Sequence, residues 1–304
     1  MPSLKSHVFA FVLKRTRKKS FASVEGMHAR LKAARKTEDH RPPGELGARV
    51  DITERRVGNA PVYEVVPKSG AGAMRIVYLH GGAYLFEITA HHWKLIAEMA
   101  ERLDARVSVS IYPLAPETTA PTVVEAGMAL YRDVLKETQA ENIVFMGDSA
   151  GGNMALVMSM TAALEGLPQP AAMVLISPAT DLSMANPAIA EVEKRDPWLG
   201  TPGGMEATRL YAGTLEFTDW RISPLYGDLS VLPPTLILTG THDILNPDTH
   251  LLAEKARRAG AQVELFEEKG MFHVWPLLDM PEARTARDRM VTWLANRFDD
   301  RRAD

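Results

Sequence analysis

Short apolar runs alternate with longer stretches of helical periodicity from about residue 48 to the end of the chain. Several of the short runs carry Val and Ile at successive positions, which indicates strands that are buried on both faces. The strand candidates are 50–56, 62–66, 75–79, 107–111, 143–146, 172–176, 235–239 and 263–266. The helical stretches are 91–103, 121–138, 150–165, 248–259 and 281–298. This alternation predicts an α/β fold with a mostly parallel eight-stranded sheet and helices on both faces.

One long segment, 181–232, interrupts the alternation. It contains no clear strand, and it holds several large apolar residues, among them Trp198 and Trp220. Connections without structure of their own are rarely longer than about 15 residues in compact domains. An insertion of this size in an α/β chain therefore predicts a lid.

Composition narrows the class of protein. The 304 residues include 46% hydrophobic residues, carry a formal charge of −3 and contain no cysteine. Such a chain is neither disordered nor collagen-like, and its length suits one large domain. The lack of cysteine removes disulfides, thiol nucleophiles and cysteine-based metal sites from consideration, and it fits a cytoplasmic location.

Positive charge is concentrated at the start of the chain. Residues 1–36 contain ten Lys and Arg against the single acid Glu25. The apolar run 8–13 is short and precedes most of these basic residues, so we expect neither a secretory signal nor a transmembrane segment. The basic segment is either an amphipathic helix in weak contact with an anionic membrane surface or the solvated face of a helix packed on its own domain, which we favour. No nucleic-acid reader motif accompanies the charge, so we expect no nucleic-acid binding.

The segment 143–158 combines a strand, a sharp turn and a helix. Its apolar strand leads into Gly147-Asp148-Ser149-Ala150-Gly151, which has the pattern G-x-S-x-G, and an apolar helix follows. In such an elbow the serine adopts a strained backbone conformation that exposes its hydroxyl, and the flanking glycines let strand and helix approach each other. We predict Ser149 as a nucleophile.

A serine hydroxyl needs a base that accepts its proton and an acid that orients the base. In α/β-hydrolases these two residues follow the serine in the order acid, then histidine, on loops after late strands. Asp243 follows the predicted strand 235–239, and His273 follows the predicted strand 263–266. The pattern therefore predicts Asp243 as the acid and His273 as the base.

Other residues near these loops could take the same roles. His242 and His250 are alternative bases, and Asp248 is an alternative acid. Neither histidine follows the last strand, and Asp248 is better placed as a helix cap. The pair His91-His92 lacks metal-ligand spacing and is interpreted as the start of a helix, so no metal and no cofactor is predicted.

Attack on a carbonyl creates an oxyanion that needs hydrogen-bond donors. An early apolar strand ends in His80-Gly81-Gly82-Ala83, which matches the HGGG-type loop of lipases and esterases. We predict the backbone N–H groups of Gly82, Ala83 and Ala150 as the donors, with Gly81 bending the chain. His80 is interpreted as an organiser of this loop.

These motifs together resemble the hormone-sensitive lipase family of α/β-hydrolases, in its bacterial family IV esterase branch with a G-D-S-A-G-G elbow. Further matching segments are Tyr112-Pro113-Leu114-Ala115-Pro116-Glu117, Ser177-Pro178 and Leu232-Pro233-Pro234-Thr235. The resemblance spans nearly the whole chain and implies Ser149 as nucleophile, Asp243 as acid and His273 as base. It has two departures: Ala83 replaces a glycine, and Pro113 replaces the arginine of the family's Y-R-L-A-P-E loop.

The resemblance also implies a cap over the pocket. N-terminal cap helices in 1–47 and a second cap segment at 181–232 would cover a catalytic domain at 48–304. A capped pocket favours acyl groups of limited length. Its candidate lining residues are Tyr84, Phe86, Trp198, Met205, Tyr211 and Trp275.

The expected function is that of a serine carboxylesterase, which hydrolyses short- to medium-chain carboxylic esters through an acyl-enzyme. A lactonase or an acyltransferase would use the same triad. The family also resembles a non-catalytic plant hormone receptor that has lost the catalytic histidine, but His273 is present here. The strand 263–266 should be last in the sheet, and its free edge could pair with a second copy, so we expect a homodimer.

Overall fold

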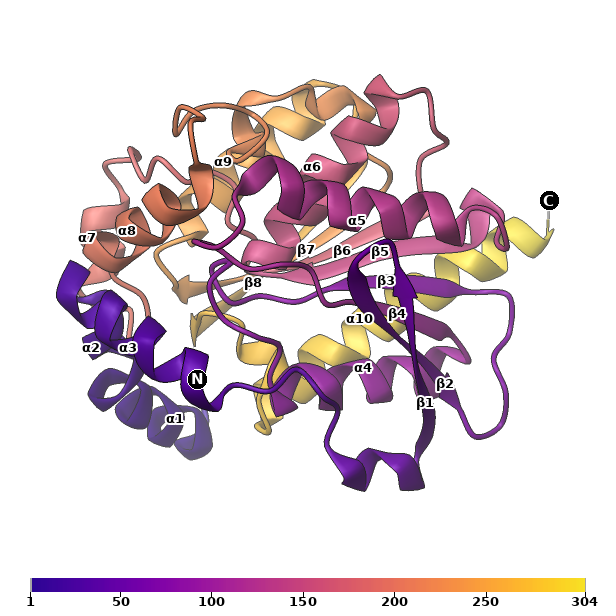
Figure 1. Cartoon of the computed structure of the whole chain (residues 1–304), viewed down its shortest axis with the longest axis horizontal. Helices are drawn as coiled ribbons and strands as arrows, with labels where there is room; N and C mark the ends of the chain where they lie inside the picture. Colours follow the sequence, from indigo (N-terminus) through magenta and orange to yellow (C-terminus); the bar gives the residue numbers. More distant parts are fainter. Residues whose placement is uncertain (1, 304) are drawn as a thin grey trace.

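One sheet organises the chain (Figure 1). The computed structural model describes residues 2–303, with side chains through residue 298. Within that range the sheet has eight strands in the order β1-β2-β4-β3-β5-β6-β7-β8. Their bounds are β1 Val50–Val57, β2 Ala60–Pro67, β3 Arg75–Leu79, β4 Arg106–Ser110, β5 Ile143–Asp148, β6 Ala172–Ile176, β7 Thr235–His242 and β8 Val263–Phe272. β2 is antiparallel to β1 and β4, and the other neighbours are parallel, which confirms the predicted sheet.

A layer of helices covers each face of the sheet. Figure 1 shows α5, α6 and α9 above the strands and α4 and α10 below them. Side chains alternate along each strand, so the apolar strand β3 sends Val77 and Leu79 to one core and Ile76 and Tyr78 to the other. The bounds are α4 Ala90–Leu103, α5 Ala120–Val134, α6 Ala150–Leu164, α9 Asn246–Arg258 and α10 Pro281–Ala303.

The helix expected over 121–138 ends four residues early. α5 stops at Val134, and the next residues form turns in which the Lys136 N–H bonds to the Asp133 carbonyl at 3.1 Å. Short 3₁₀ helices occur elsewhere in connections. They are η1 Gly44–Ala48, η2 Ala140–Asn142, η3 Pro224–Tyr226, η4 Leu229–Val231 and η5 Trp275–Leu277.

The N-terminal helices and the insertion 181–232 lie side by side at one end of the sheet (Figure 1). Their helices are α1 Leu4–Arg15, α2 Arg17–Phe21, α3 Val24–Thr37, α7 Ile189–Glu193 and α8 Thr201–Ala212. A Cβ at Gly203 would lie 2.5 Å from the Phe21 Cα, so the glycine permits the close approach of α2 and α8. His28 and Glu206 join α3 to α8 with a 2.6 Å contact between Nε2 and Oε1.

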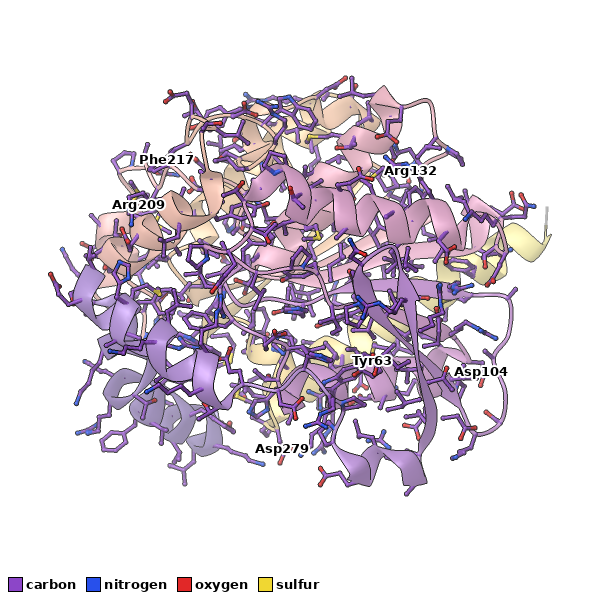
Figure 2. All side chains as sticks on the ribbon, in the orientation of Figure 1. Tyr63, Asp104, Arg132, Arg209, Phe217 and Asp279 are labelled. Carbon is purple, nitrogen blue, oxygen red and sulfur yellow. The ribbon has the colours of Figure 1, made fainter. Side chains whose placement is uncertain are left out.

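The helix α1 is anchored to the first turn of α10 and to the residues just before it. Lys5 pairs with Asp279 at 2.6 Å, near the lower edge of the molecule in Figure 2, and the Ser3 hydroxyl donates to Glu282 at 3.0 Å. No helix within residues 2–303 has the length and apolar composition that a membrane crossing requires.

A buried ion pair ties three strands together beneath α5. The Arg75 guanidinium on β3 lies 2.9 Å from the Glu64 carboxylate on β2, and both groups are nearly inaccessible to solvent. The Ser108 hydroxyl on β4 donates to Glu64 at 2.9 Å and accepts from Arg75 at 3.0 Å. Breaking a buried pair typically costs about 3 to 5 kcal/mol, and because Glu64 also accepts from Arg55 on β1 at 2.8 Å, loss of Arg75 should cost an amount at the lower end of that range.

We expect Arg75→Met to lower the free energy of unfolding by about 3 kcal/mol, measured by urea denaturation. The matched control is Lys194→Met, because Lys194 pairs with Glu191 on the exposed surface and should contribute little. Equal stability of the two variants would contradict this interpretation of the Arg75 pair.

Candidate active site

Ser149 occupies a strained turn between the central strand β5 and the helix α6. Its φ of 52° and ψ of −117° lie outside the regions that non-glycine residues normally adopt. A Cβ at Gly147 would lie 2.4 Å from the Gly151 carbonyl oxygen, and a Cβ at Gly151 would lie 1.9 Å from that of Leu79. Both glycines are therefore required for the close approach of strand and helix that the motif predicted.

Ser149, His273 and Asp243 form a hydrogen-bonded chain. The Ser149 hydroxyl lies 2.9 Å from the His273 Nε2, and the His273 Nδ1 lies 2.9 Å from the Asp243 Oδ2. This geometry corresponds to a neutral imidazole whose Nδ1–H donates to Asp243 and whose Nε2 accepts from the serine. Asp243 is fully buried, and His273 is 4% exposed.

The alternative acid and bases have other partners. Asp248 lies in the first turn of α9 and accepts from the Asn186 amide at 2.7 Å. His250 contacts Glu267 on β8, and His242 ends β7. None of the three lies among the residues that line the pocket at Ser149.

The environment of His273 favours the charged imidazolium. Burial alone would lower the pKa of His273, but the negative charge of Asp243 and its hydrogen bond outweigh burial and raise that pKa above its ordinary value of 6.5. The buried carboxylates of Asp196 and Asp148 act in the same direction. The ring is therefore a stronger base than a free histidine.

The three residues predicted as oxyanion donors line the same pocket as Ser149. The backbone N–H groups of Gly82, Ala83 and Ala150 donate to no other residue in the described part of the chain. Gly82 has a φ of 131°, and Ala83 has a φ of 54°, so the backbone of this loop turns sharply through left-handed conformations. Ala150 also begins α6, where the helix dipole favours negative charge.

Asp148 connects the elbow to this loop, a role that sequence reasoning missed. Its buried carboxylate accepts from the Tyr78 hydroxyl at 2.8 Å and the Gly81 N–H at 3.0 Å, and it lies 3.2 Å from the His92 Nε2. Burial would raise the pKa of Asp148, but His92, Tyr78 and Gly81 together lower it. The aspartate inside the G-D-S-A-G-G elbow was the available signal.

The histidines near the loop lie as the sequence suggested. The His80 Nδ1 contacts the Gly81 carbonyl at 2.7 Å, and its ring stacks on Tyr112 with 4.3 Å between centroids. Burial lowers the pKa of His80 to about 4, so it is neutral. His92 lies in the first turn of α4 and accepts from the Thr89 N–H at 3.0 Å.

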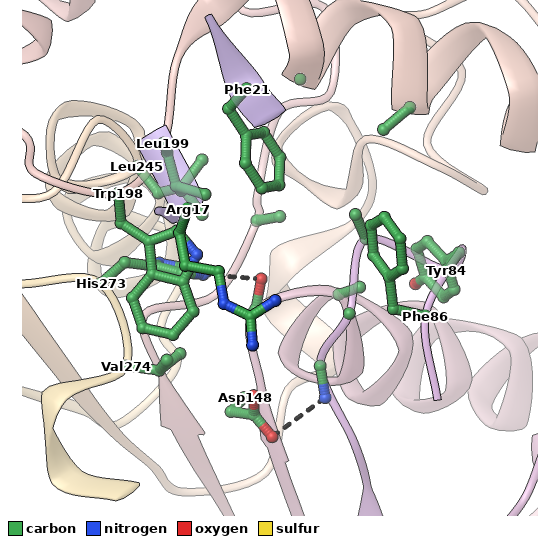
Figure 3. A pocket seen from close by; sticks show the side chains of 18 of the residues that line it. Arg17, Phe21, Tyr84, Phe86, Asp148, Trp198, Leu199, Leu245, His273 and Val274 are labelled. Atoms are coloured by element: carbon green, nitrogen blue, oxygen red, sulfur yellow. Dashed lines mark hydrogen bonds between the residues drawn. The ribbon is translucent and has the colours of Figure 1, made fainter. Parts of the chain in front are cut away.

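A cavity of about 190 Å³ opens onto the serine hydroxyl (Figure 3). Four of the six candidate pocket residues line it: Tyr84, Phe86, Trp198 and Tyr211. The rings of Tyr84 and Tyr211 stack with 3.7 Å between centroids, and the edge of Trp198 meets the His273 ring at 5.7 Å. The wall of the cavity is mainly apolar and aromatic.

Met205 and Trp275 are outside the lining of this cavity. Gly204, Ala207 and Tyr211 face it from α8 at positions i, i+3 and i+7, so Met205 lies off that face of the helix. Trp275 begins η5, and its fully buried ring packs in the core between the sheet and the layer of α4 and α10. Sequence reasoning could not set the helix phase or the direction of this turn.

The N-terminal helices contribute three residues that the sequence did not single out for the pocket. Phe21 and Arg17 come from α2, and Arg30 comes from α3. Their approach depends on the packing of α2 and α3 against α8, which no local pattern reveals. The basic composition of 1–36 was the only available signal.

A second buried carboxyl group lies beside Asp243. Asp196 in the insertion accepts from the backbone N–H groups of Trp198 at 2.7 Å, Leu199 at 2.8 Å and Ile244 at 2.9 Å. Burial and the charge of Asp243 raise the pKa of Asp196 to about 7. Asp196 therefore fastens the insertion to the acid loop. The Asp-Pro dipeptide, a turn signal, was the only clue in the sequence.

Comparison with known proteins agrees with this fold. A family model described as alpha/beta hydrolase fold matches residues 76–277. The acetyl-hydrolase of Streptomyces hygroscopicus is 34% identical over 253 residues, which cover 81% of this chain and 80% of the relative. The esterase of Acinetobacter venetianus is 30% identical over 224 residues, 72% of this chain and 74% of the relative.

Solved structures give the same result. The hormone-sensitive lipase homologue EstE7 from a metagenome library superposes with a TM-score of 0.83 at 30% identity, covering 98% of this chain and 100% of that one. EstE5, whose crystal was soaked with p-nitrophenyl butyrate, gives a TM-score of 0.87 at 25% identity over 98% of this chain and 99% of that one. The chain belongs to the hormone-sensitive lipase family of α/β-hydrolases.

Proposed function

We propose that this protein hydrolyses short- to medium-chain carboxylic esters through an acyl-enzyme on Ser149. The chain is a carboxylic ester hydrolase, as its family and its named relatives indicate. The observation that carries the proposal is the hydrogen-bonded chain from Ser149 through His273 to Asp243. The serine end of this chain lies in a pocket that is also lined by residues with unpaired backbone N–H groups. No step in this scheme calls for a metal or an organic cofactor.

The proposed reaction has two similar halves. The Ser149 oxygen attacks the ester carbonyl carbon while the His273 Nε2 takes the hydroxyl proton, and Asp243 stabilises the imidazolium. The N–H groups of Gly82, Ala83 and Ala150 would bind the oxyanion, where each donor is typically worth about 2.7 to 4 kcal/mol. His273 then protonates the departing alcohol, and a water molecule releases the acid by the same steps.

The preference for short chains rests on the shape of the pocket. Tyr84 and Tyr211 stack against each other across one side of it, and the Tyr84 hydroxyl is fixed by a 2.7 Å bond to Asn153. A long acyl chain would have to displace this rigid pair. We propose that the N-terminal helices in 1–47 and the segment 181–232 act as the cap that limits the chain length. A lactonase or an acyltransferase would use the same residues.

We expect Ser149→Ala to reduce kcat for p-nitrophenyl butyrate by about 10⁴-fold or more, since no other described residue takes the place of the hydroxyl. Wild-type kcat/KM should fall along the p-nitrophenyl ester series from butyrate to palmitate. A melting curve controls for folding of the variant. Substantial turnover by Ser149→Ala would contradict the role of the serine, and faster hydrolysis of palmitate would contradict the short-chain preference.

The pH dependence should follow from the raised pKa of His273. Only the neutral ring can accept the serine proton, so kcat/KM should fall as the pH drops through the folded-state pKa, with a midpoint above 6.5. Asp243→Asn removes the attraction that raises this pKa, so its midpoint should be lower and its kcat much reduced. A wild-type midpoint below 6.5 would contradict the electrostatic account.

We also propose weak contact of α1 with an anionic membrane surface. Leu4, Val8, Phe11 and Val12 form an exposed apolar stripe on this helix, at spacings of four, three and one residues, and basic residues flank it. Replacing Leu4, Val8 and Phe11 together by Ser should abolish cosedimentation with phosphatidylserine vesicles, whereas Leu164→Ser, an exposed apolar change elsewhere, should not. Equal cosedimentation of both variants would remove the proposal.

We also propose a homodimer and a cytoplasmic location. β8 is the edge strand of the sheet, as the sequence predicted, and its half-buried side chains leave a surface that a second copy could cover. The lack of cysteine is compatible with the cytoplasm.

A further inference from the structure

Two arginine side chains enter the pocket that holds Ser149. Arg17 begins α2 and Arg30 lies in α3, and both line the cavity together with the serine and His273. Figure 3 shows the Arg17 side chain extending across the pocket, with its guanidinium in the space between Trp198 and Phe86. Such charges are unexpected in a pocket whose other walls are mainly aromatic and aliphatic.

Neither guanidinium has a hydrogen-bonded or ionic partner in the described chain. Arg30 is instead held by aromatic rings, with its guanidinium carbon 4.0 Å from the centroid of Phe86 and 5.8 Å from that of Phe21. Arg35, one turn further along α3, shows the contrast: it donates to the Leu85 and Ala115 carbonyls, both at 2.7 Å. Stacking fixes the orientation of Arg30 but leaves its N–H donors free.

The two positive charges also repel each other. Burial and the charge of Arg17 together lower the pKa of Arg30 to about 10, and Glu38 partly opposes both. Burial likewise lowers the pKa of His91 in the pocket wall, with a smaller contribution from Arg17. An anion placed between Arg17 and Arg30 would relieve this repulsion.

The acidic groups of the pocket wall do not neutralise the pair. Glu38 accepts from the Glu87 N–H at 3.0 Å, and burial raises the pKa of Glu87. Asp148 is committed to Tyr78 and Gly81, and Asp243 to His273. The guanidinium pair therefore remains available to a ligand.

We infer that the physiological substrate is an ester whose acyl or alcohol part carries a carboxylate or a similar anion, which Arg17 and Arg30 bind. The inference rests on the proposed function, because it concerns the substrate of the same serine. Guanidinium groups bind carboxylates with paired, charge-assisted hydrogen bonds. Since Arg17 is exposed to solvent and Arg30 is half-buried, the preference should be moderate and should weaken at high salt.

The test compares esters that differ only in charge. 4-Acetoxybenzoate and 4-acetoxybenzamide place the charged or neutral group on the alcohol side, and monomethyl adipate and methyl adipamate place it on the acyl side. The wild-type enzyme should prefer the anionic member of one pair by about tenfold in kcat/KM, equivalent to about 1.4 kcal/mol. The pair that shows the preference identifies the side of the substrate that meets the arginines.

Variants of Arg17 test whether the arginines cause the preference for anionic esters. Arg17→Gln should lower the ratio of anionic to neutral kcat/KM about tenfold, and Arg17→Lys should retain part of it. The matched control is Lys19→Gln, which removes the same charge from the same helix but lies outside the pocket lining and should leave the ratio unchanged. An equal effect of Arg17→Gln and Lys19→Gln would assign the preference to overall charge and overturn the inference.

The remaining outcomes separate this inference from the proposed function. If the wild type hydrolyses p-nitrophenyl butyrate in a Ser149-dependent way but shows no anionic preference in either pair, the inference is wrong and the proposed function stands. If it hydrolyses no ester, the proposed function falls, and calorimetry with 4-hydroxybenzoate and 4-hydroxybenzamide decides the inference. Tighter binding of the benzoate that is lost in Arg17→Gln supports it, and equal binding of both compounds overturns it.

Discussion

The active site depends on a backbone conformation that Ser149 would not adopt alone. A non-glycine residue at φ 52° and ψ −117° is held there only because a central strand ends and a helix begins on either side of it. The 1.9 Å that would separate a Gly151 Cβ from the Leu79 carbonyl oxygen measures how tightly these elements are packed. The packing of β5 and α6 therefore holds Ser149 in its strained backbone conformation, and that conformation exposes the serine hydroxyl.

The same packing positions the rest of the catalytic machinery. Asp148, next to Ser149, accepts from the Gly81 N–H, so the loop 80–83 is tied to the turn that holds the serine. Asp196 fixes the backbone that follows Asp243 in the same way, because it accepts a hydrogen bond from the Ile244 N–H. Both carboxylates are buried, and each is satisfied by N–H or O–H donors as buried charges require. The hydrogen bonds of Asp148 and Asp196 thus fix the positions of these loops more precisely than apolar packing, which is not directional.

The sequence predicted what local patterns and chain order determine. Apolar runs marked all eight strands, and the order of serine, aspartate and histidine along the chain selected the three residues that the structure brings within hydrogen-bond distance. It could not predict what depends on the contact of distant segments. Met205 was misplaced because a helix phase is set by tertiary packing, and Arg17 was missed because α2 meets the pocket only after docking on α8.

The proposed catalytic residues and the pocket arginines come from different segments of the chain, and this separation bears on substrate specificity. The residues that would perform the chemistry belong to the loops after β3, β5, β7 and β8, whereas Arg17 and Arg30 come from the N-terminal helices. Charge in the pocket can therefore change through substitutions in α2 or α3 without disturbing the bonds among Ser149, His273 and Asp243. A guanidinium in a partly dehydrated cavity also acts more strongly than on an open surface. The proposed electrostatic selection of substrates thus rests on the basic N-terminal segment, and the proposed limit on their length rests on the apolar walls.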